Sequence, residues 1–498
     1  MNDTPLSDRW FTEAGVQEDL QRQPHLFARL AENALTVAES LRGNYFKNTA
    51  RFIAALRRAI AETRAGRRPE PVLEVYPVPA TSWADVRGEV VTFIDGGVGQ
   101  VQLASRVPIL LRVGSYRVRT GERQLSEREQ FGYYPVILGD LEGGSKERKD
   151  FVDIVRITAE LLAGLSALER TPDLRVLMFH GPLTYLVGSY AGHTPFTERD
   201  IDLFLHQYAP DAPGAHRLKE MFLQQAHVDV YPGMTRRPDE WARQRVFEPL
   251  AFMAFLLRQL RDAARRRPQP VYIVGVVERG ALRDFSETVL LKRVFRGLRE
   301  KGNGDYFNRL YGRTDLSTPK ALLDRLGYTD ALLLAMLLEP GEYAESWVIH
   351  KFEGLRRGEV GLPGEAGEEI VNFEVLKPPA PSGFPPIRGC YLHVAEIADP
   401  LRIEVFDELA TPAYLEEVVR RVYLYARLLP GYGFPVGLDI ADKYAHIPAW
   451  LTDAYGKLIR YHLGVSLQQG EISDAEMRRV LVQAIYMTHR DWLFRPEP

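Results

Sequence analysis

Cysteine is almost absent from this chain of 498 residues, in which Cys390 is the only example. A single cysteine excludes an internal disulfide and any zinc site built on several thiolates. Long apolar runs are missing as well, because the longest, such as residues 331–338, are far too short to cross a bilayer. The N-terminal residues lack the basic and apolar segments of a signal peptide. We therefore expect a cytoplasmic protein with no membrane-spanning segment.

The chain also lacks an excess of charge of one sign, since 63 Lys and Arg residues stand against 66 Asp and Glu residues, giving a net charge of −3. Any binding to DNA must then come from local basic patches. Several catalytic signatures are missing too. Residues 143–146 have neither the spacing nor the preceding strand of a Walker A motif, and no Gly-x-Ser-x-Gly or His-Glu-x-x-His occurs. We do not expect the chain to hydrolyse ATP by itself.

What is present is the composition of an ordinary globular protein, 45% hydrophobic and 26% charged. The patterns predict an α/β protein with a mixed central sheet flanked by helices, and with helical additions at both ends. Residues 1–80 form a helical region, with helical spacing over 25–64 and a linker over 68–80. Residues 81–448 form the main domain, with insertions at about 186–268 and 353–387, and 449–498 are C-terminal helices. After residue 405 we expect helices at roughly 413–428, 447–464 and 473–488.

The stretch from Val90 to Gly97 predicts a buried strand that ends in a carboxylate, Asp95, followed by two glycines. The glycines let the backbone approach whatever Asp95 binds. A simple Asp-Gly turn is the alternative. A helix should follow from about residue 146 to 168, with apolar positions every three or four residues. It carries Glu160 beside its apolar stripe, four residues after Arg156, and an exposed Arg/Glu pair is the alternative interpretation.

A second stretch, residues 174–183, repeats this pattern: a buried strand, one titratable residue, His180, and then glycine. Two strands that end alike suggest that Asp95 and His180 emerge side by side at one edge of the sheet. A hydrogen-bonded histidine in a turn is the alternative. Residues 270–279 predict a third buried strand that ends in charge. This order of elements matches the RNase H-like arrangement, in which carboxylates hold a pair of divalent cations such as Mg²⁺ or Mn²⁺.

The sequence here resembles the NurA nucleases, over residues 95 to about 448. The resemblance is carried by seven short motifs in order, at 93–97, 156–160, 177–183, 274–276, 329–341, 402–404 and 434–442. It implies an RNase H-like core that uses Mn²⁺ or Mg²⁺, cuts single-stranded DNA and resects DNA ends. It also implies a homodimer that works with a hexameric HerA-like ATPase, in DNA end processing or antiviral defence.

The departures from the family pattern concern the site. The pattern has aspartate at His180, tyrosine at Phe434, histidine at Asp442 and usually lysine at Glu278. His180 and Asp442 look like a reciprocal exchange that keeps one carboxylate and one imidazole, which favours Mn²⁺ over Mg²⁺. We therefore predict Asp95, Glu160 and His180 as metal ligands, with Asp442 as a further catalytic residue. The alternative is a decayed site in a catalytically inactive scaffold that binds DNA or the HerA-like motor.

Arginines supply the candidate contacts to DNA phosphates. They occur in a cluster after residue 235, at the end of the helix before the third buried strand, at the end of that strand, and in the stretch 401–405. Arginines at a helix C-terminus are also favoured by the helix dipole without any ligand. The residues predicted to contact DNA are Arg236, Arg237, Arg266, Arg279 and Arg402.

Overall fold

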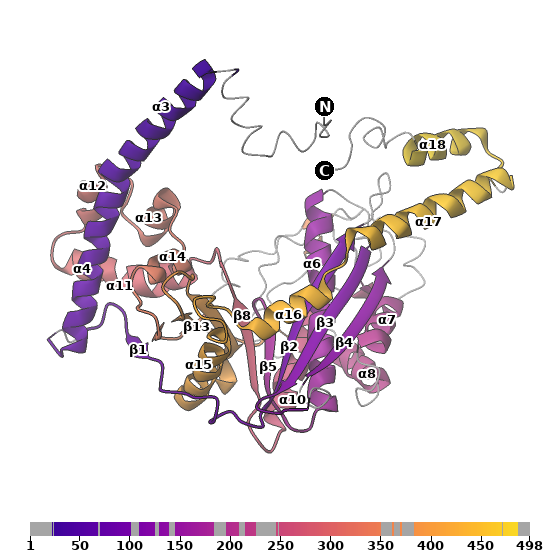
Figure 1. Cartoon of the computed structure of the whole chain (residues 1–498), viewed down its shortest axis with the longest axis horizontal. Coiled ribbons are helices and arrows are strands. Elements are labelled where there is room, and N and C mark those ends of the chain that lie inside the picture. The colour runs from indigo at the N-terminus through magenta and orange to yellow at the C-terminus, as the bar shows by residue number, and fades with distance from the viewer. Residues whose placement is uncertain are drawn as a thin grey trace, which may run out of the picture. The chain divides into compact units, whose positions relative to one another are not determined.

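The protein is described here from a computed structural model of the whole chain (Figure 1). The residues that the structure describes are 22, 24–67, 70–100, 109–124, 129–138, 145–183, 196–208, 215–225, 246–247, 249–349, 361–362, 369–370, 383–470 and 472–486.

A mixed β-sheet forms the centre of the main part of the chain. Its strand order over the described residues is β1-β9-β13-β14-β8-β5-β2-β3-β4, with β10 paired to β13 at the side. The ten strands are β1 Val75–Pro77, β2 Val90–Gln100, β3 Ile109–Arg119, β4 Glu129–Leu138, β5 Leu174–His180, β8 Tyr272–Val277, β9 Glu342–Ala344, β10 Trp347–Val348, β13 Ile387–His393 and β14 Leu401–Phe406. Two separate pairs are β6 Phe196–Thr197 with β7 Val246–Phe247, and β11 Gly361–Leu362 with β12 Glu369–Ile370.

The half of the sheet around β2 has RNase H-like topology. Strands β2, β3 and β4 form an antiparallel meander, and β5 and then β8 join on the other side of β2 in parallel. The parallel connections run through helices α6 (Ser145–Arg170) and α10 (Pro249–Arg265), as parallel strands require. This order confirms the α/β fold predicted from the sequence.

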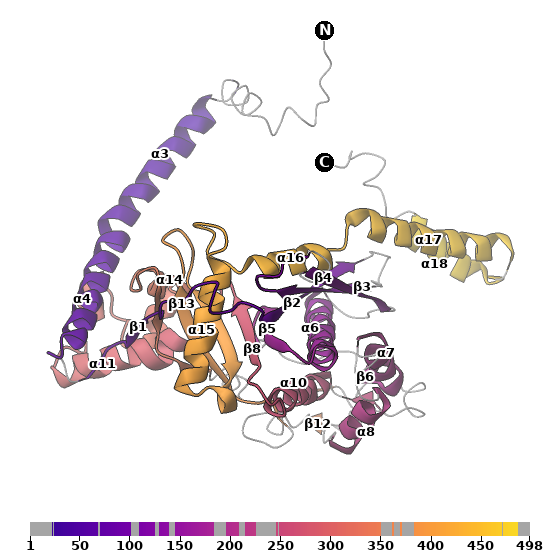
Figure 2. The same ribbon diagram turned by 60° about the horizontal axis from the view of Figure 1, so that its bottom comes forward.

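Helices cover both faces of the sheet (Figure 2). One face packs against α15 (Pro412–Ala426) and α16 (Val436–Ala445), and α6 lies against the other with α10 beside it. Strand alternation explains the division, because successive side chains point to opposite faces. Val91 and Phe93 of β2, and Val176 and Met178 of β5, belong to the core under α15 and α16. By the same alternation, Asp95 and His180 point to that face.

The predicted helices are largely confirmed. Residues 146–168 lie in α6, and the predictions near the C-terminus correspond to α15, α17 and α18. The remaining helical segments are α3 Pro24–Ser40, a π-helical turn at Leu41–Phe46, α4 Lys47–Arg64, α7 Glu198–Tyr208, α8 Ala215–Gln225, a π-helical turn at Ser286–Leu290, α11 Leu291–Glu300, α12 Tyr306–Tyr311, α13 Pro319–Leu326, α14 Asp330–Ala335, a 3-10 turn at Asp407–Leu409, α17 Ala449–Gln468 and α18 Ala475–Tyr486.

Two elements correct the sequence analysis. Helix α16 was not expected, because its ten residues include a glycine and Pro435 caps it without a side-chain hydrogen bond. Packing against strands β2 and β3 stabilises this helix instead. The linker predicted over 68–80 contains β1, which pairs with β9 through Val75, Tyr76 and Pro77.

The chain divides into two compact units. One comprises residues 73–293 and 326–459 and contains the sheet, and the other comprises residues 1–72, 294–325 and 460–498. In the second unit Phe307 of α12 packs edge-on against Phe52 of α4, with ring centroids 5.1 Å apart. None of the described helices combines the length and apolar character that a membrane span needs.

Glu169, near the end of α6, provides a pH-dependent contribution to stability that can be measured. Burial raises the pKa of Glu169 to about 7, although the charges of Arg266 and Arg267 act to lower it. Its Oε2 atom has no hydrogen-bond partner among the described residues. Between the unfolded-state pKa and 7 the folded state retains a proton that the unfolded state loses, so stability falls as the pH rises through this range. Above pH 7 the penalty is complete.

We therefore expect Glu169→Gln to be more stable than the wild type at pH 8, by about 1 kcal/mol after allowance for the partial exposure of the group. At pH 4.5 the two proteins should unfold at nearly the same denaturant concentration, because Glu169 is then protonated in the folded state and about half protonated in the unfolded state, so little of the penalty has developed. Chemical denaturation at both pH values measures the difference. An equal difference at both values would show that charge on Glu169 is not the cause.

Candidate metal centre

Asp95 lies inside a long strand. Strand β2 continues past it to Gln100, with paired residues in β3 along its whole length, including Gly114 opposite Asp95. The Asp-Gly turn considered from the sequence is therefore wrong, and so is the expectation that the strand ends at Asp95. What ends there is the pairing of β2 with β5, whose last matched residues are Ile94 and Phe179. Asp95 is 5% exposed and its Oδ1 accepts a hydrogen bond from the backbone N–H of Gly96.

His180 is the last residue of β5, next to the point where β2 and β5 separate. Its Nδ1 lies 2.8 Å from Oδ2 of Asp95 and forms a hydrogen bond with it. The prediction that these two side chains emerge together is confirmed. The ring of Phe434 packs on the imidazole, with centroids 5.2 Å apart, and Phe434 itself is buried. His180 is thus oriented by a carboxylate at one nitrogen and by an aromatic ring at its side.

Asp442 lies on α16, which packs across β2 and β3 where these strands carry glycines. A β-carbon on Gly97 would lie 2.1 Å from the carbonyl oxygen of Ala445, and one on Gly114 would lie 2.3 Å from that of Ala441. Gly437 of the helix is equally close to the ring of Phe93. The helix therefore rests directly on strand backbone, which places Asp442 over Asp95.

The three side chains form the one group of potential metal ligands found among the described residues. One donor atom each from Asp95, His180 and Asp442 lie within 4.8 Å of one another. Ligand atoms around a Mn²⁺ or Mg²⁺ ion are at most about 4.2 Å apart, twice the usual distance of about 2.1 Å. The donor atoms are therefore close enough for a hard or borderline divalent ion, and their mixture of oxygen and imidazole nitrogen suits Mn²⁺.

The electrostatics of the group favour a cation. Partial burial, the negative charge of Asp95 and a hydrogen bond with it raise the pKa of Asp442 above its usual value. Burial alone would lower the pKa of His180, but the hydrogen bond with Asp95 and the charges of Asp95, Glu160 and Asp442 outweigh it and raise that pKa. Close carboxylates share a proton when no cation is bound, and a metal ion removes this repulsion.

Glu160 lies beside this group but on the other face of the sheet. It is 1% exposed, so the exposed Arg/Glu pair considered from the sequence is wrong, although Arg156 Nη1 does donate to Glu160 Oε1 at 2.5 Å. That oxygen is 2.5 Å from where a β-carbon of Gly96 would be, so the missing side chain leaves room for the carboxylate next to Asp95. Its charge raises the pKa of His180, yet it is not part of the three-residue group. Its role as a ligand remains a prediction.

From the sequence, Asp442 is predicted to be catalytic but not a metal ligand. Its only signal was the position that it shares with the histidine of the family pattern. Glu278, another of the four departures from the family pattern, lies with Arg279 just after β8, the strand that pairs with β5. Both are exposed, and Arg279 has a positive φ of 51°, which is strained for a residue with a side chain.

The arginines predicted to bind DNA phosphates differ in their exposure and in their position relative to the candidate centre. Arg279 lies at the sheet edge that carries His180 and has 80% of its side chain exposed. Arg402 contradicts its prediction, because it is buried and its Nε donates to Glu404 Oε1 at 2.8 Å inside the core. Arg266 is exposed but follows α10 and precedes β8, so it lies at the opposite end of the strand from the candidate centre. Arg236 and Arg237 lie outside the described residues.

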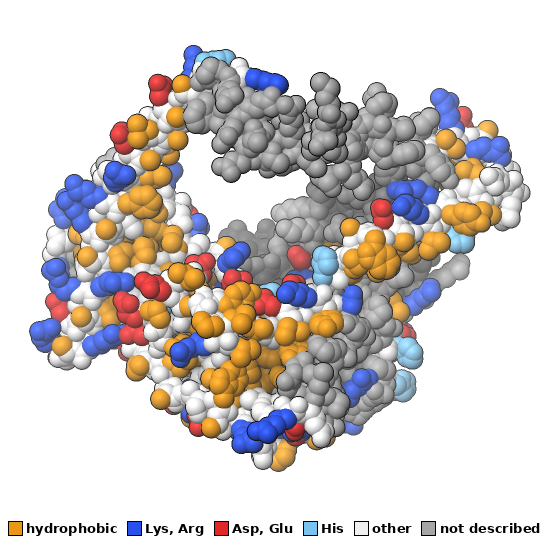
Figure 3. All heavy atoms as spheres, in the orientation of Figure 1, with side chains coloured by type: hydrophobic (Ala, Val, Ile, Leu, Met, Phe, Trp, Pro, Cys, Tyr) orange, Lys and Arg blue, Asp and Glu red, His pale blue; other side chains and the backbone are white. Residues whose placement is uncertain are grey.

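The surface shown in Figure 3 carries Lys and Arg in small groups among Asp and Glu. This distribution agrees with the net charge of −3, and any contact with DNA must be local.

Comparison with protein families gives a match to the NurA domain over residues 89–447. That range contains the candidate centre and more than two thirds of the chain. The chain belongs to the NurA family. No functionally curated protein matches it.

Solved NurA structures are similar at low sequence identity. The crystal structure of the NurA nuclease from Sulfolobus solfataricus is 12% identical with a TM-score of 0.43, and the match covers 86% of this chain and 98% of that one. A structure of NurA with manganese is 11% identical with a TM-score of 0.36, covering 87% and 97%. One of NurA bound to dAMP and manganese is 13% identical with a TM-score of 0.28, covering 86% and 92%.

Proposed function

We propose that this NurA-family protein is a nuclease that requires a divalent metal ion and cuts single-stranded DNA. The observation that carries the proposal is the convergence of Asp95, His180 and Asp442, within 4.8 Å of one another, at the edge of an RNase H-like sheet. Two carboxylates and an imidazole that share one small volume offer a divalent cation both negative charge and donor atoms. Family membership adds support, since it links this chain to proteins named as nucleases.

The side chains have separable roles. Asp95, His180 and Asp442 would hold the ion, with Glu160 contributing negative charge beside them. A bound divalent cation lowers the pKa of a water molecule and neutralises charge on a scissile phosphate. Phe434 and Asp95 fix the orientation of the His180 ring. Arg279 presents its guanidinium at the same sheet edge, where it would bind the phosphate backbone and position the strand.

The wider assembly is also proposed. We infer that the chain forms a homodimer and works with a HerA-like hexameric ATPase, which would supply the ATP hydrolysis that this sequence has no Walker A motif to perform. DNA end processing and defence against foreign DNA are the processes in which such a pair would act.

Metal dependence tests the nuclease proposal directly. We expect Mn²⁺ to bind the purified protein in a calorimetric titration, and labelled single-stranded DNA to be cut in Mn²⁺ but not in EDTA. The assay is run with and without the HerA-like motor. If Mn²⁺ binds but DNA is not cut with any divalent ion, even when the motor is present, the protein is a catalytically inactive scaffold. The observation that favours this second function is His180, which stands where the family pattern has aspartate. Absence of any Mn²⁺ binding would contradict the proposed centre itself.

A further inference from the structure

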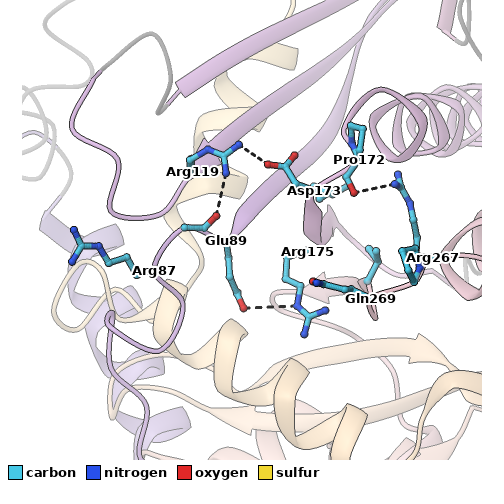
Figure 4. A pocket seen from close by; sticks show the side chains of 12 residues that line it. Arg87, Glu89, Arg119, Pro172, Asp173, Arg175, Arg267 and Gln269 are labelled. Atoms are coloured by element: carbon cyan, nitrogen blue, oxygen red, sulfur yellow. Dashed lines mark hydrogen bonds and ion pairs between the residues drawn. The ribbon is translucent and has the colours of Figure 1, made fainter.

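A second charged site lies at the opposite end of the same strands. It is a cavity of about 660 Å³ where β2, β5 and β8 begin, lined by Arg87, Gly88, Glu89, Arg119, Pro172, Asp173, Leu174, Arg175, Arg267, Pro268, Gln269 and Val271 (Figure 4). Because β5 runs from Leu174 here to His180 at the other edge, the cavity is about 17–20 Å from the candidate metal centre, at roughly 3.3 Å per residue. The two sites cannot share a small ligand.

Two carboxylates line this cavity, and both are neutralised by arginines. Asp173 Oδ2 accepts from Arg119 Nη2 at 2.5 Å. Glu89 is held through both oxygens by Arg421, from Nη2 at 2.6 Å and from Nε at 3.0 Å. Arg421 is buried and also pairs with Glu417, which is paired with Arg420 as well, so these two arginines together balance the charges of Glu89 and Glu417. Neither carboxylate is left to balance the other arginines.

Three arginines therefore line the cavity without a hydrogen bond to a carboxylate, although Arg175 forms a long ion pair with Glu89. Arg175 comes no nearer to Glu89 than 3.9 Å and donates Nη1 to the carbonyl of Pro270. Arg267 donates to the backbone carbonyls of Leu168, Thr171 and Pro172. Arg87 is exposed at the margin of the cavity and forms no ion pair with any described residue (Figure 4). Carbonyl partners orient a guanidinium but do not cancel its charge.

We propose that this cavity binds the phosphate group of a small anionic ligand, either inorganic phosphate or a nucleoside monophosphate. Guanidinium groups bind phosphate oxygens in pairs of parallel hydrogen bonds, and a cavity lined by Arg119, Arg175 and Arg267, with Arg87 at its margin, is suited to this. The volume lies in the range of sites for small molecules, about 300–1,000 Å³, and leaves room for a nucleoside beside the phosphate. The Gln269 amide, next to Arg175 in the middle of the group, offers a donor and an acceptor for that part (Figure 4).

The positions of the arginines are fixed before any ligand binds, which favours affinity. Arg175 and Arg421 both stack on the ring of Tyr272, with guanidinium carbons 5.0 Å and 4.5 Å from its centroid. Arg267 is held by the carbonyls that end α6. The site does not depend on the proposed nuclease activity, since it shares no residue with the metal centre.

The test is calorimetry on the full-length protein at constant ionic strength in EDTA, which keeps divalent ions from the other site. The probes are inorganic phosphate, dAMP and deoxyadenosine. We expect saturable binding of phosphate or dAMP with a Kd below about 1 mM, and none of deoxyadenosine. Phosphate alone would identify the free ion as the ligand, and tighter binding of dAMP would identify a nucleotide.

Variants assign the binding to this cavity. Arg87→Gln and Arg175→Gln should each weaken binding at least about tenfold, since each removes a charged hydrogen-bond donor. Arg87 is exposed, so its variant folds even if that of Arg175 does not. The matched control is Arg265→Gln, on the same side of the fold but paired with Glu408 and outside the cavity lining, which should keep the wild-type Kd. No binding of phosphate or dAMP up to about 10 mM, equal Kd values in all variants, or equal binding of deoxyadenosine would each overturn the proposal. Asp95→Asn must leave phosphate binding intact, so a failed nuclease proposal is distinguishable from a failed anion site.

Discussion

Replacing Asp95 by asparagine should reduce Mn²⁺-dependent cleavage of single-stranded DNA on the order of 10³-fold, with little effect on folding. The Asp95 carboxylate is buried and forms hydrogen bonds with both His180 and Asp442. It is therefore the residue that contacts both other members of the donor group. Asparagine has the same shape but no charge, so it leaves one carboxylate to hold the ion. Initial rates of cleavage over a range of Mn²⁺ concentrations measure the loss.

The matched control is Asp439→Asn, which removes a carboxylate one turn earlier on the same helix. Asp439 is outside the donor group and hydrogen-bonds to Tyr432. The Asp439→Asn variant should cut DNA at a rate within about threefold of the wild type, which corresponds to a change below about 1 kcal/mol in the activation free energy. Full activity in Asp95→Asn, or equal losses in both variants, would contradict the role given to Asp95.

An exchange of two residues separates an adapted centre from a decayed one. The single variants H180D and D442H each unbalance the set of one imidazole and two carboxylates, and we expect each to lose at least about 10²-fold in rate. The double variant H180D/D442H restores that set with the order of the family pattern, and it should recover to within about tenfold of the wild type. Losses that simply add in the double variant would show that the two positions do not act as one site.

The largest effect on stability should come from Gly97→Ala. The added methyl group would meet the backbone carbonyl of Ala445 at 2.1 Å, and neither strand β2 nor helix α16 has a flexible side chain there that could move away. Such overpacking costs about 2–3 kcal/mol and lowers the melting temperature by roughly 5 °C in a domain of this size. Because α16 carries Asp442, we also expect Mn²⁺ affinity to fall.

Gly297→Ala is the control for this change. No atom lies within 4 Å of the β-carbon that it would add, and Gly297 is inside α11, where alanine is favoured over glycine. That variant should be as stable as the wild type or slightly more stable. Thermal unfolding followed by calorimetry compares the two. An unchanged melting temperature in Gly97→Ala would show that α16 is not seated on the strand as described.

Much of the fold could be predicted from the sequence because its signals are local. A buried strand reads as a continuous apolar run, so β2, β5 and β8 were recognisable, and the spacing of apolar residues predicted α6. The convergence of Asp95 with His180 also followed, since parallel strands bring corresponding ends to one edge. The resemblance to the NurA family rested on these segments together with three later motifs, at 329–341, 402–404 and 434–442.

Other features depended on contacts between distant parts of the chain. The residues around position 402 give no sign that Arg402 is buried and paired with Glu404. Likewise, the Asp-Gly sequence at Asp95 is compatible with a turn, and only the pairing of β2 with β3 beyond Asp95 shows that the strand continues. Glu160 was predicted from the sequence as a ligand, but the sequence did not show that it approaches from the far face of the sheet, through the open space at Gly96.

The sequence by itself determined the order of the elements and brought two candidate ligands to the same edge, because strand burial and alternation are properties of neighbouring residues. Only the tertiary structure decided the third candidate ligand. Asp442 lies on a short helix with weak local signals, and that helix is placed by glycines about 330–350 positions away in the chain. A contact of backbone on backbone leaves no side-chain pattern in the sequence, so its position could be known only once the chain was folded.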